Sequence, residues 1–235
     1  MKKKGFLFAC AIVCLIGSTA LAQKLDKFAA DLGKKSVMGK EIRVPYTDVI
    51  SYFGFVNPGS APDEERNGKK YYYLYVWVPA VAPEIGVRMI SPVPDNMKPE
   101  PTDVVTALYT EKGSDKSSYF DTWISFEKAQ GIVSLEDVLP KGKSANWVSI
   151  QQNDDSGEMP AQPSGNKYNS LLRITSEVSD PLKALTVGLY RIGFTTYKVG
   201  EVQGSFMAQV GAPVKLPGVR ISNTLQGLVE SMEKK

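Results

Sequence analysis

The stretch GLYRIGFTTYKVGEVQGSFMAQVG, residues 188–211, carries the pattern that decides the fold. It holds two runs rich in β-branched and aromatic residues, and the short segment between them contains glycine and charged residues. Runs of this composition that end at turn-forming residues are typical of β-strands. Residues 185–197 and 204–211 are therefore predicted to be strands.

Similar runs recur through most of the chain. Clusters of Gly, Pro, Asn and Asp separate them, as in NPGSAPDEERNG (57–68) and PVPDNMKPEPTD (92–103). Many short strands with such turn signals predict an antiparallel β-sandwich or barrel. The other predicted strands are residues 42–56, 70–78, 86–90, 104–110, 119–126, 146–151 and 168–178.

Helical spacing is found only at the margins of this pattern. Two sets of apolar residues recur at positions i, i+3, i+4 and i+7, which predicts one helix near each end of the chain. They are Leu25, Phe28, Ala29 and Leu32, and then Leu225, Leu228, Val229 and Met232. The piece SLEDVLPKG (134–142) predicts a third helix, capped by Ser134 and stopped at Pro140. All three are expected to pack against the sheets.

One predicted strand is apolar on both faces. In KKYYYLYVWVPA (69–80), the rings at 71, 73, 75 and 77 share one face, and Tyr72, Leu74, Val76 and Val78 share the other. Such a strand lies between two layers or under a loop. A ladder of rings that stacks on a ligand is the alternative, because tyrosine serves both roles.

The first residues predict export. A lysine cluster, an apolar run and Ala20-Leu21-Ala22 follow one another in the order of a signal peptide, so residues 1–22 are expected to be removed. Residues 23–235 then form a single β-sandwich domain with a C-terminal helix, in the periplasm, on the cell surface or at the outer membrane. Membrane association is expected only if Cys10 or Cys14 is lipidated, and plain export is favoured.

The composition limits the chemistry. The chain has no histidine, and both of its cysteines lie within residues 1–22. This excludes a Ser-His-Asp arrangement, thiol catalysis and most zinc and copper sites. After removal of residues 1–22, 25 basic residues face 25 acidic ones, so no nucleic-acid partner is expected.

Carboxylate chemistry remains open. A pair of carboxylates can hydrolyse a glycoside, and Asp121, Glu127, Glu136 and Asp137 are the candidates. Nothing in the sequence singles out a pair among them. An enzyme is therefore not expected.

A second acidic feature lies in the loop IQQNDDSGEMPAQPSGNKY (150–168). Asp154 and Asp155 are adjacent there, and neighbouring like charges repel unless solvent or a cation separates them. From these residues alone, a solvated turn is the commoner explanation and a calcium site the alternative.

Several stretches resemble the major surface lipoprotein of Leptospira and its relatives. They are YFGFVNPGSAPD (52–63), YYLYVWVPAVAPEIGVRMISP (72–92), FDTWISFE (120–127), NKYNSLLRI (166–174) and the opening stretch, 188–211. The resemblance implies a mainly β fold, an antiparallel jelly-roll β-sandwich with short peripheral helices.

The resemblance also implies a bound Ca²⁺. Carried onto this chain, the family's ligands are Asp121, Thr122, Asp154, Asp155 and Tyr168. The family's acidic loop is a longer run of aspartates than the single pair found here, so weaker calcium binding is expected. Three acidic groups that are scattered in the sequence would then converge on one cation.

The function expected from these features is that of a non-catalytic, exported, calcium-binding surface or periplasmic protein. The family's adhesin-like character implies contact with an extracellular matrix protein or polysaccharide. One alternative is a carbohydrate-binding jelly-roll module that uses the rings of Tyr71–Trp77, Trp123 and Trp147. A second alternative is a carboxylate-based hydrolase. A glycan array separates the first two, and turnover identifies the third.

Overall fold

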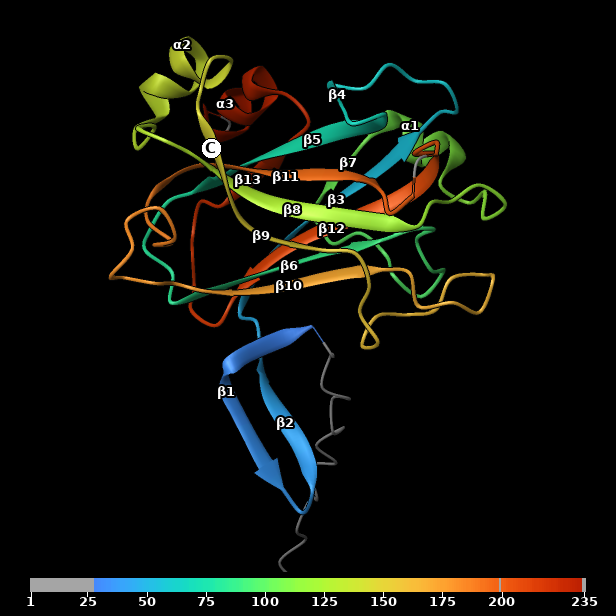
Figure 1. Ribbon diagram of the computed structural model, residues 1–235, viewed down its shortest axis with the longest axis horizontal. Coiled ribbons are helices and arrows are strands. Elements are labelled where there is room, and N and C mark those ends of the chain that lie inside the picture. Colours follow the sequence, from blue (N-terminus) through green and yellow to red (C-terminus); the bar gives the residue numbers. More distant parts are fainter. Residues whose placement is uncertain (1–27, 199, 234–235) are drawn as a thin grey trace, which may run out of the picture.

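The computed structural model describes residues 28–198 and 200–233. Two β-sheets pack face to face in it, as Figure 1 shows. The strands of the first sheet, in spatial order, are β10 (Ser170–Thr175), β6 (Glu84–Ile90), β12 (Gly204–Ala212), β3 (Asp48–Val56) and β7 (Val104–Val105). Those of the second are β13 (Arg220–Ser222), β5 (Lys69–Val78), β11 (Gly188–Thr196), β8 (Thr122–Ala129) and β9 (Trp147–Asn153). The short strand β4 (Glu64–Arg66) pairs with β5.

The predicted mainly β sandwich is confirmed. The pairings within the two sheets are antiparallel, apart from the parallel contact of β7 with β3. The predicted strand 42–56 is interrupted at Tyr46 and Thr47, so that only its second part, β3, enters the sandwich. The other differences between predicted and observed strand ends are mostly of one to three residues, as hydrogen-bonded boundaries commonly vary.

The main core lies between the two sheets. At its centre the rings of Phe126 and Tyr190 stack with centroids 5.1 Å apart. Tyr72, Leu74, Val76 and Val78 of β5 all belong to this core. On the opposite face of β5, Trp77 is also buried, in a second apolar cluster outside the sheet. The structure therefore confirms that β5 is covered on both faces.

Helices cover the outer side of the second sheet. Helix α3 (Leu225–Glu233) packs Leu225 and Leu228 against Trp77, as the spacing predicted. Beside it lie the 3₁₀ turn η1 (Leu135–Asp137) and helix α2 (Val138–Gly142). The Ser134 hydroxyl accepts the Glu136 N–H, which confirms the predicted cap.

Two expectations on local structure are wrong. Helix α2 does not stop at Pro140, because this proline lies in the first helical turn, where its missing N–H is not needed. Residues 104–110 are not one strand: β7 has two residues and helix α1 (Ala107–Lys112) follows. The Thr106 hydroxyl accepts the Tyr109 N–H, which starts that helix.

The predicted helix at the start of the domain is also wrong. Strands β1 (Ala29–Val37) and β2 (Lys40–Pro45) form a hairpin that projects away from the sandwich (Figure 1). The backbone N–H groups of Asp31 and Leu32 donate to the buried Glu84 carboxylate, which holds this segment extended. Leu25 and the predicted signal peptide lie outside the described residues. Within the described residues, no helix is long and apolar enough to cross a membrane.

Candidate functional site

The five predicted ligands gather at one end of the sandwich. Asp121 and Thr122 lie at the start of β8, Asp154 and Asp155 follow β9, and Tyr168 precedes β10. Strands β8 and β9 are paired there, and the Thr122 N–H donates to the Tyr168 carbonyl at 3.1 Å. The β8–β9 pairing and this hydrogen bond between the two sheets thus bring three distant sequence segments together.

Asp121 is the most perturbed carboxyl group of this end. Its Oδ1 is buried and has no hydrogen-bond partner among the described residues. Burial, followed by the charges of Asp155 and Asp154, raises the pKa of Asp121 to about 6. Burial and the charge of Asp154 also raise the pKa of Asp155. The carboxylates therefore repel one another, and the repulsion has not been relieved by a hydrogen bond to Asp121 Oδ1.

Thr122 and Tyr168 play a different part. The fully buried Thr122 hydroxyl lies 2.7 Å from the Ser170 hydroxyl and accepts the Ser170 N–H at 2.8 Å. The Tyr168 side chain is exposed, and its carbonyl already accepts the Thr122 N–H. The Thr122 hydroxyl and the Tyr168 carbonyl therefore hold β8 against the start of β10.

The acidic loop is tied to β10 from its first residue. The Asn153 side-chain amide donates to the Asp155 carbonyl at 3.1 Å and to the Leu171 carbonyl at 2.9 Å. Asp154 Oδ1 accepts the Asp155 N–H at 2.8 Å. Asp154 is half-buried and Asp155 is exposed. The loop backbone is therefore fixed, while the Asp155 carboxylate faces solvent.

Sequence reasoning missed the residues that support this end. The buried Gln162 amide donates to the Phe120 carbonyl at 2.7 Å and to the Ser91 carbonyl at 2.8 Å. Asn169 Oδ1 accepts the Ser91 N–H at 2.9 Å. These bonds fix the backbone that precedes Asp121 and follows Tyr168. The KYNS stretch contains Asn169, but nothing in the sequence marks Gln162.

The donor set matches calcium only in part. Within residues 28–198 and 200–233, no three Asp, Glu, His or Cys side chains are already placed to hold a metal ion. The three aspartates supply the hard oxygen donors that Ca²⁺ prefers, and Asp121 has a buried oxygen without a partner. The Thr122 hydroxyl and the Tyr168 carbonyl are already hydrogen-bonded within the protein. The aspartates fit the ion, and the remaining ligands would have to be carbonyls or water.

The candidate catalytic carboxylates do not form a free pair. Glu127 is buried, and its Oε2 lies 2.6 Å from Arg191 Nη2 and 2.7 Å from Arg191 Nε. Its Oε1 accepts the Ser125 hydroxyl at 2.8 Å. Glu136 and Asp137 lie apart from it in η1. Glu127 is thus engaged in a buried ion pair with Arg191.

The rings on the outer face of the second sheet pack against one another and against arginine. The Arg191 guanidinium lies 3.8 Å from the Tyr73 ring centroid and 4.3 Å from that of Trp147. Tyr71 meets Trp123 edge to face at 89°. A sugar stacks on a flat, open ring, so this arrangement does not favour the carbohydrate-binding alternative.

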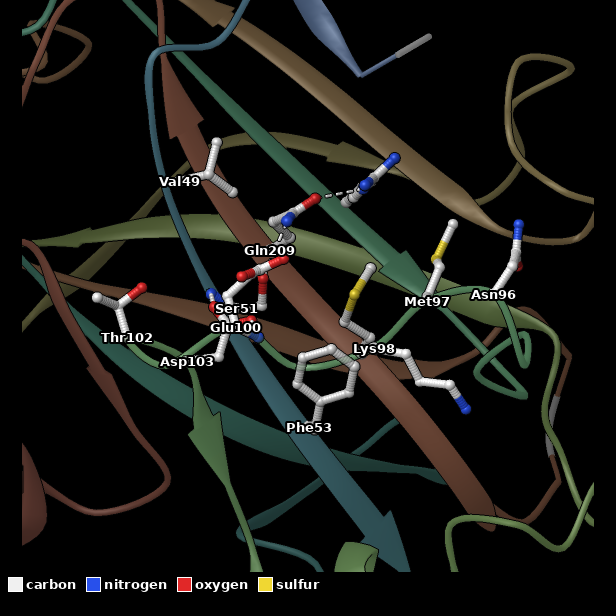
Figure 2. Close-up of a pocket in the computed structure, with 12 residues that line it drawn as sticks. Val49, Ser51, Phe53, Asn96, Met97, Lys98, Glu100, Thr102, Asp103 and Gln209 are labelled. Atoms are coloured by element: carbon white, nitrogen blue, oxygen red, sulfur yellow. Dashed lines mark hydrogen bonds between the residues drawn. The ribbon is translucent and has the colours of Figure 1, made fainter. Parts of the chain in front are cut away.

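A cavity of about 420 Å³ opens on the outer side of the first sheet (Figure 2). Arg88 donates to Gln209 at 2.7 Å, Gln209 donates to the Ser51 hydroxyl at 2.9 Å, and the Ser51 N–H donates to Asp103 at 2.9 Å. Because these polar groups bond to each other, they need no ligand to satisfy them.

Together, the two packed sheets, the aspartate cluster at one end and the projecting hairpin define a β-sandwich protein. The chain belongs to the Lipl32 family, surface lipoproteins of the order Spirochaetales, whose family model matches residues 40–221. This membership confirms the resemblance seen in the sequence and indicates an exported protein of the cell surface. A search of curated proteins finds no match to the chain.

Proposed function

We propose that this chain is a non-catalytic, calcium-binding module of an exported surface protein. The observation that carries the proposal is the buried Asp121 Oδ1, which has no hydrogen-bond partner among the described residues and faces the repulsion of Asp154 and Asp155. A buried charge that is left unpaired is costly, and it is usually paired or bound to a metal.

The three aspartates would hold the ion. A bound Ca²⁺ supplies two positive charges that offset the negative charges of Asp121, Asp154 and Asp155. These residues come from the start of β8 and from the loop after β9, so their shared ligand would join two segments. Thr122 and Tyr168 would act mainly as a brace, because their hydrogen bonds hold β8 to β10. The role of calcium in this proposal is structural.

Calorimetry on chelator-treated protein tests this proposal. We expect one calcium site, and we expect Asp155→Asn to weaken it while the metal-free fold is kept, because this carboxylate is exposed. Asp95→Asn is a matched control, since its side chain is 87% exposed and lies outside the cluster. Mg²⁺ should substitute poorly, because it demands a tight octahedron. The absence of calcium binding at millimolar concentration would refute the site.

We also propose that the surface module contacts an extracellular polymer, either a matrix protein or a polysaccharide. The support is the membership in a surface-protein family. Parallel binding assays on immobilised matrix proteins and on a glycan array separate these partner classes. Binding to neither class would remove this part of the proposal and leave the calcium site untouched.

A further inference from the structure

The hairpin of β1 and β2 exposes an apolar face that also carries lysines. Lys35 pairs with Ile42 and Val37 pairs with Lys40, so these four side chains lie on one face, and the alternation of β2 adds Val44 to it. We call this set the apolar-basic face. Val37, Ile42 and Val44 are 48%, 41% and 43% exposed. None of the five residues is acidic.

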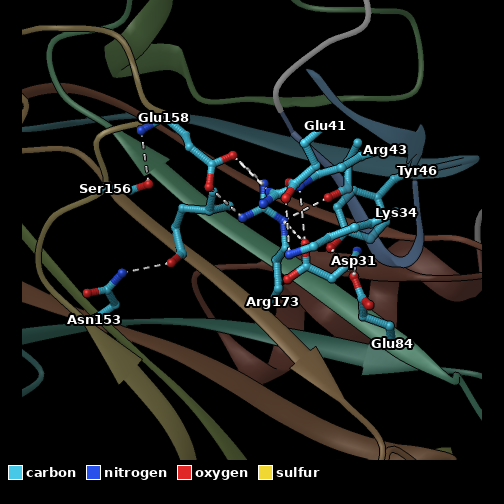
Figure 3. Close-up of polar contacts among 12 residues, drawn as sticks. Asp31, Lys34, Glu41, Arg43, Tyr46, Glu84, Asn153, Ser156, Glu158 and Arg173 are labelled. Atoms are coloured by element: carbon cyan, nitrogen blue, oxygen red, sulfur yellow. Dashed lines mark hydrogen bonds and ion pairs between the residues drawn. The ribbon is translucent and has the colours of Figure 1, made fainter. Parts of the chain in front are cut away.

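The opposite face of the hairpin is held by the sandwich. Figure 3 shows Arg43 directed at Glu158, with a distance of 2.9 Å between Nη1 and Oε2. Arg173 of β10 donates to the same carboxylate and to the Ala29 carbonyl. Glu84 accepts the Tyr46 hydroxyl at 2.7 Å as well as two backbone N–H groups of β1. The base of the hairpin is therefore fixed, and the apolar-basic face is directed away from these contacts.

Folding of the hairpin does not require the methionine, Met38, that is found at its tip. Met38 and Gly39 have φ angles of 51° and 74°, and Met38 is 98% exposed. Asn67 and Gly68, in the turn between β4 and β5, have the same φ angles. Asn-Gly is the favoured pair for such a turn, because asparagine tolerates positive φ better than other side chains. Methionine at the same position costs strain and exposes an apolar side chain.

We propose that the tip and the apolar-basic face form a docking surface for an anionic lipid bilayer. Met38 and Val37 would enter the headgroup region, while the stems of Lys35 and Lys40 lie along the apolar surface and their ammonium groups reach lipid phosphates. The charges favour this occupant over a second copy of the chain. Stacking two such faces would bring lysines against lysines, and lysines beside an edge strand also oppose strand addition.

Vesicle co-sedimentation tests this docking surface. The protein used begins at Gln23, so it contains every described residue. It lacks the apolar leader, which would itself enter lipid. We expect binding to phosphatidylcholine vesicles that contain phosphatidylglycerol, and little binding to phosphatidylcholine alone. Met38→Asn should keep the hairpin, because it installs the residue of the equivalent turn, and should weaken vesicle binding about tenfold. Lys35→Gln and Lys40→Gln should each weaken it about fivefold.

The matched controls lie elsewhere on the surface. Val178→Asn removes an apolar side chain that is 84% exposed, and Lys143→Gln removes an exposed charge; neither should change vesicle binding. The reciprocal variant Asn67→Met should not raise it, because that turn lacks the apolar-basic face. Failure of the unaltered chain to bind anionic vesicles would overturn the proposal. So would a concentration-dependent dimer that Met38→Asn abolishes, since the face would then belong to a second copy.

Discussion

Arg43 of the projecting hairpin and Glu158 of the acidic loop form an ion pair of 2.9 Å that links two otherwise separate features. Glu158 lies four positions after Asp154, and the same carboxylate binds Arg173 of β10 at 2.9 Å. The loop that carries two proposed calcium ligands therefore also fixes the hairpin base (Figure 3). This contact gives the proposed metal site a physical connection to the proposed docking surface.

Replacement of Glu158 should loosen the hairpin. Glu158→Gln removes the charge that Arg43 and Arg173 share, so the amides of β1 and β2 are expected to exchange hydrogen faster while those of β5 and β11 stay protected. Hydrogen exchange read by mass spectrometry measures both. Glu177→Gln breaks an exposed ion pair with Lys183 and serves as the control. Equal protection of the hairpin in both variants would show that the Glu158 ion pairs do not anchor it.

The same contact predicts a pH dependence. Burial raises the pKa of Glu158, but the hydrogen bonds and charges of Arg173 and Arg43 outweigh it, and the pKa falls below the ordinary value of 4.5. A lowered carboxyl pKa adds stability that is present above the ordinary value and is lost as the pH falls through the folded-state value. The protection factors of the hairpin amides, which are exchange rates corrected for the intrinsic rate at each pH, should therefore fall below about pH 4.5. Unchanged protection factors down to pH 3 would contradict this.

Truncation of Leu228 should destabilise the whole domain. This side chain is fully buried between α3 and the second sheet, so Leu228→Ala is expected to lower the free energy of unfolding by about 2 to 5 kcal/mol. Urea unfolding measures the loss. Gln226→Ala, on the exposed side of the same helix, should change it little. If both variants unfold at the same urea concentration, α3 does not contribute to the cooperative core.

Gly204 is expected to tolerate no side chain. Its φ is +89°, and a Cβ atom there would lie 1.8 Å from the Ser118 carbonyl oxygen. Gly204→Ala should therefore cost more than about 3 kcal/mol, because a rigid backbone has to move. Gly165 has a similar φ of +85° but open space around it, so Gly165→Ala should cost only about 1 kcal/mol. Thermal unfolding of the two variants separates the clash from the strain.

The sandwich was predictable because its strands carry local signals. In β5 the apolar and aromatic run of residues 71–78 is unbroken, and in β11 and β12 turn residues mark the ends. The start of the domain was not predictable in this way. Phe28, Ala29 and Leu32 have helical spacing, but the bonds from Asp31 and Leu32 to Glu84 join residues more than 50 positions apart. Such long-range contacts leave no periodic trace in the sequence.

The sequence predicted the charged residues of the candidate site better than the bonding of its uncharged groups. The family motifs led to Asp121, Asp154 and Asp155, which do repel one another in the structure. The same motifs did not reveal that the Thr122 hydroxyl is bound to Ser170. The difference arises because a hydroxyl's role depends on the neighbouring strand, whereas a buried carboxylate needs a counter-charge in any arrangement.

Asp121 should make the metal-free protein sensitive to pH. Its pKa is about 6 in the folded state, above the ordinary value of 3.8. A raised carboxyl pKa contributes stability that is fully present below the ordinary value and is lost as the pH rises through the folded value. In chelator, the free energy of unfolding should therefore fall between about pH 4 and pH 7. Saturating calcium should restore stability, by about 2.7 kcal/mol at a hundred times the dissociation constant.

Asp121→Asn separates this charge effect from a packing effect. The asparagine amide cannot ionise. In chelator at pH 7 the substitution should therefore raise the free energy of unfolding by about 1 kcal/mol, a value discounted for solvent screening. It should also flatten the dependence of that free energy on pH. It should also weaken calcium binding. Asp115→Asn is the control, because hydrogen bonds from Ser117 lower the pKa of Asp115 rather than raise it. No increase in the free energy of unfolding is expected for this variant. Urea unfolding at several pH values and calorimetry measure both properties. If Asp121→Asn instead destabilises the metal-free protein and leaves calcium affinity unchanged, Asp121 is a structural residue and the proposed site fails.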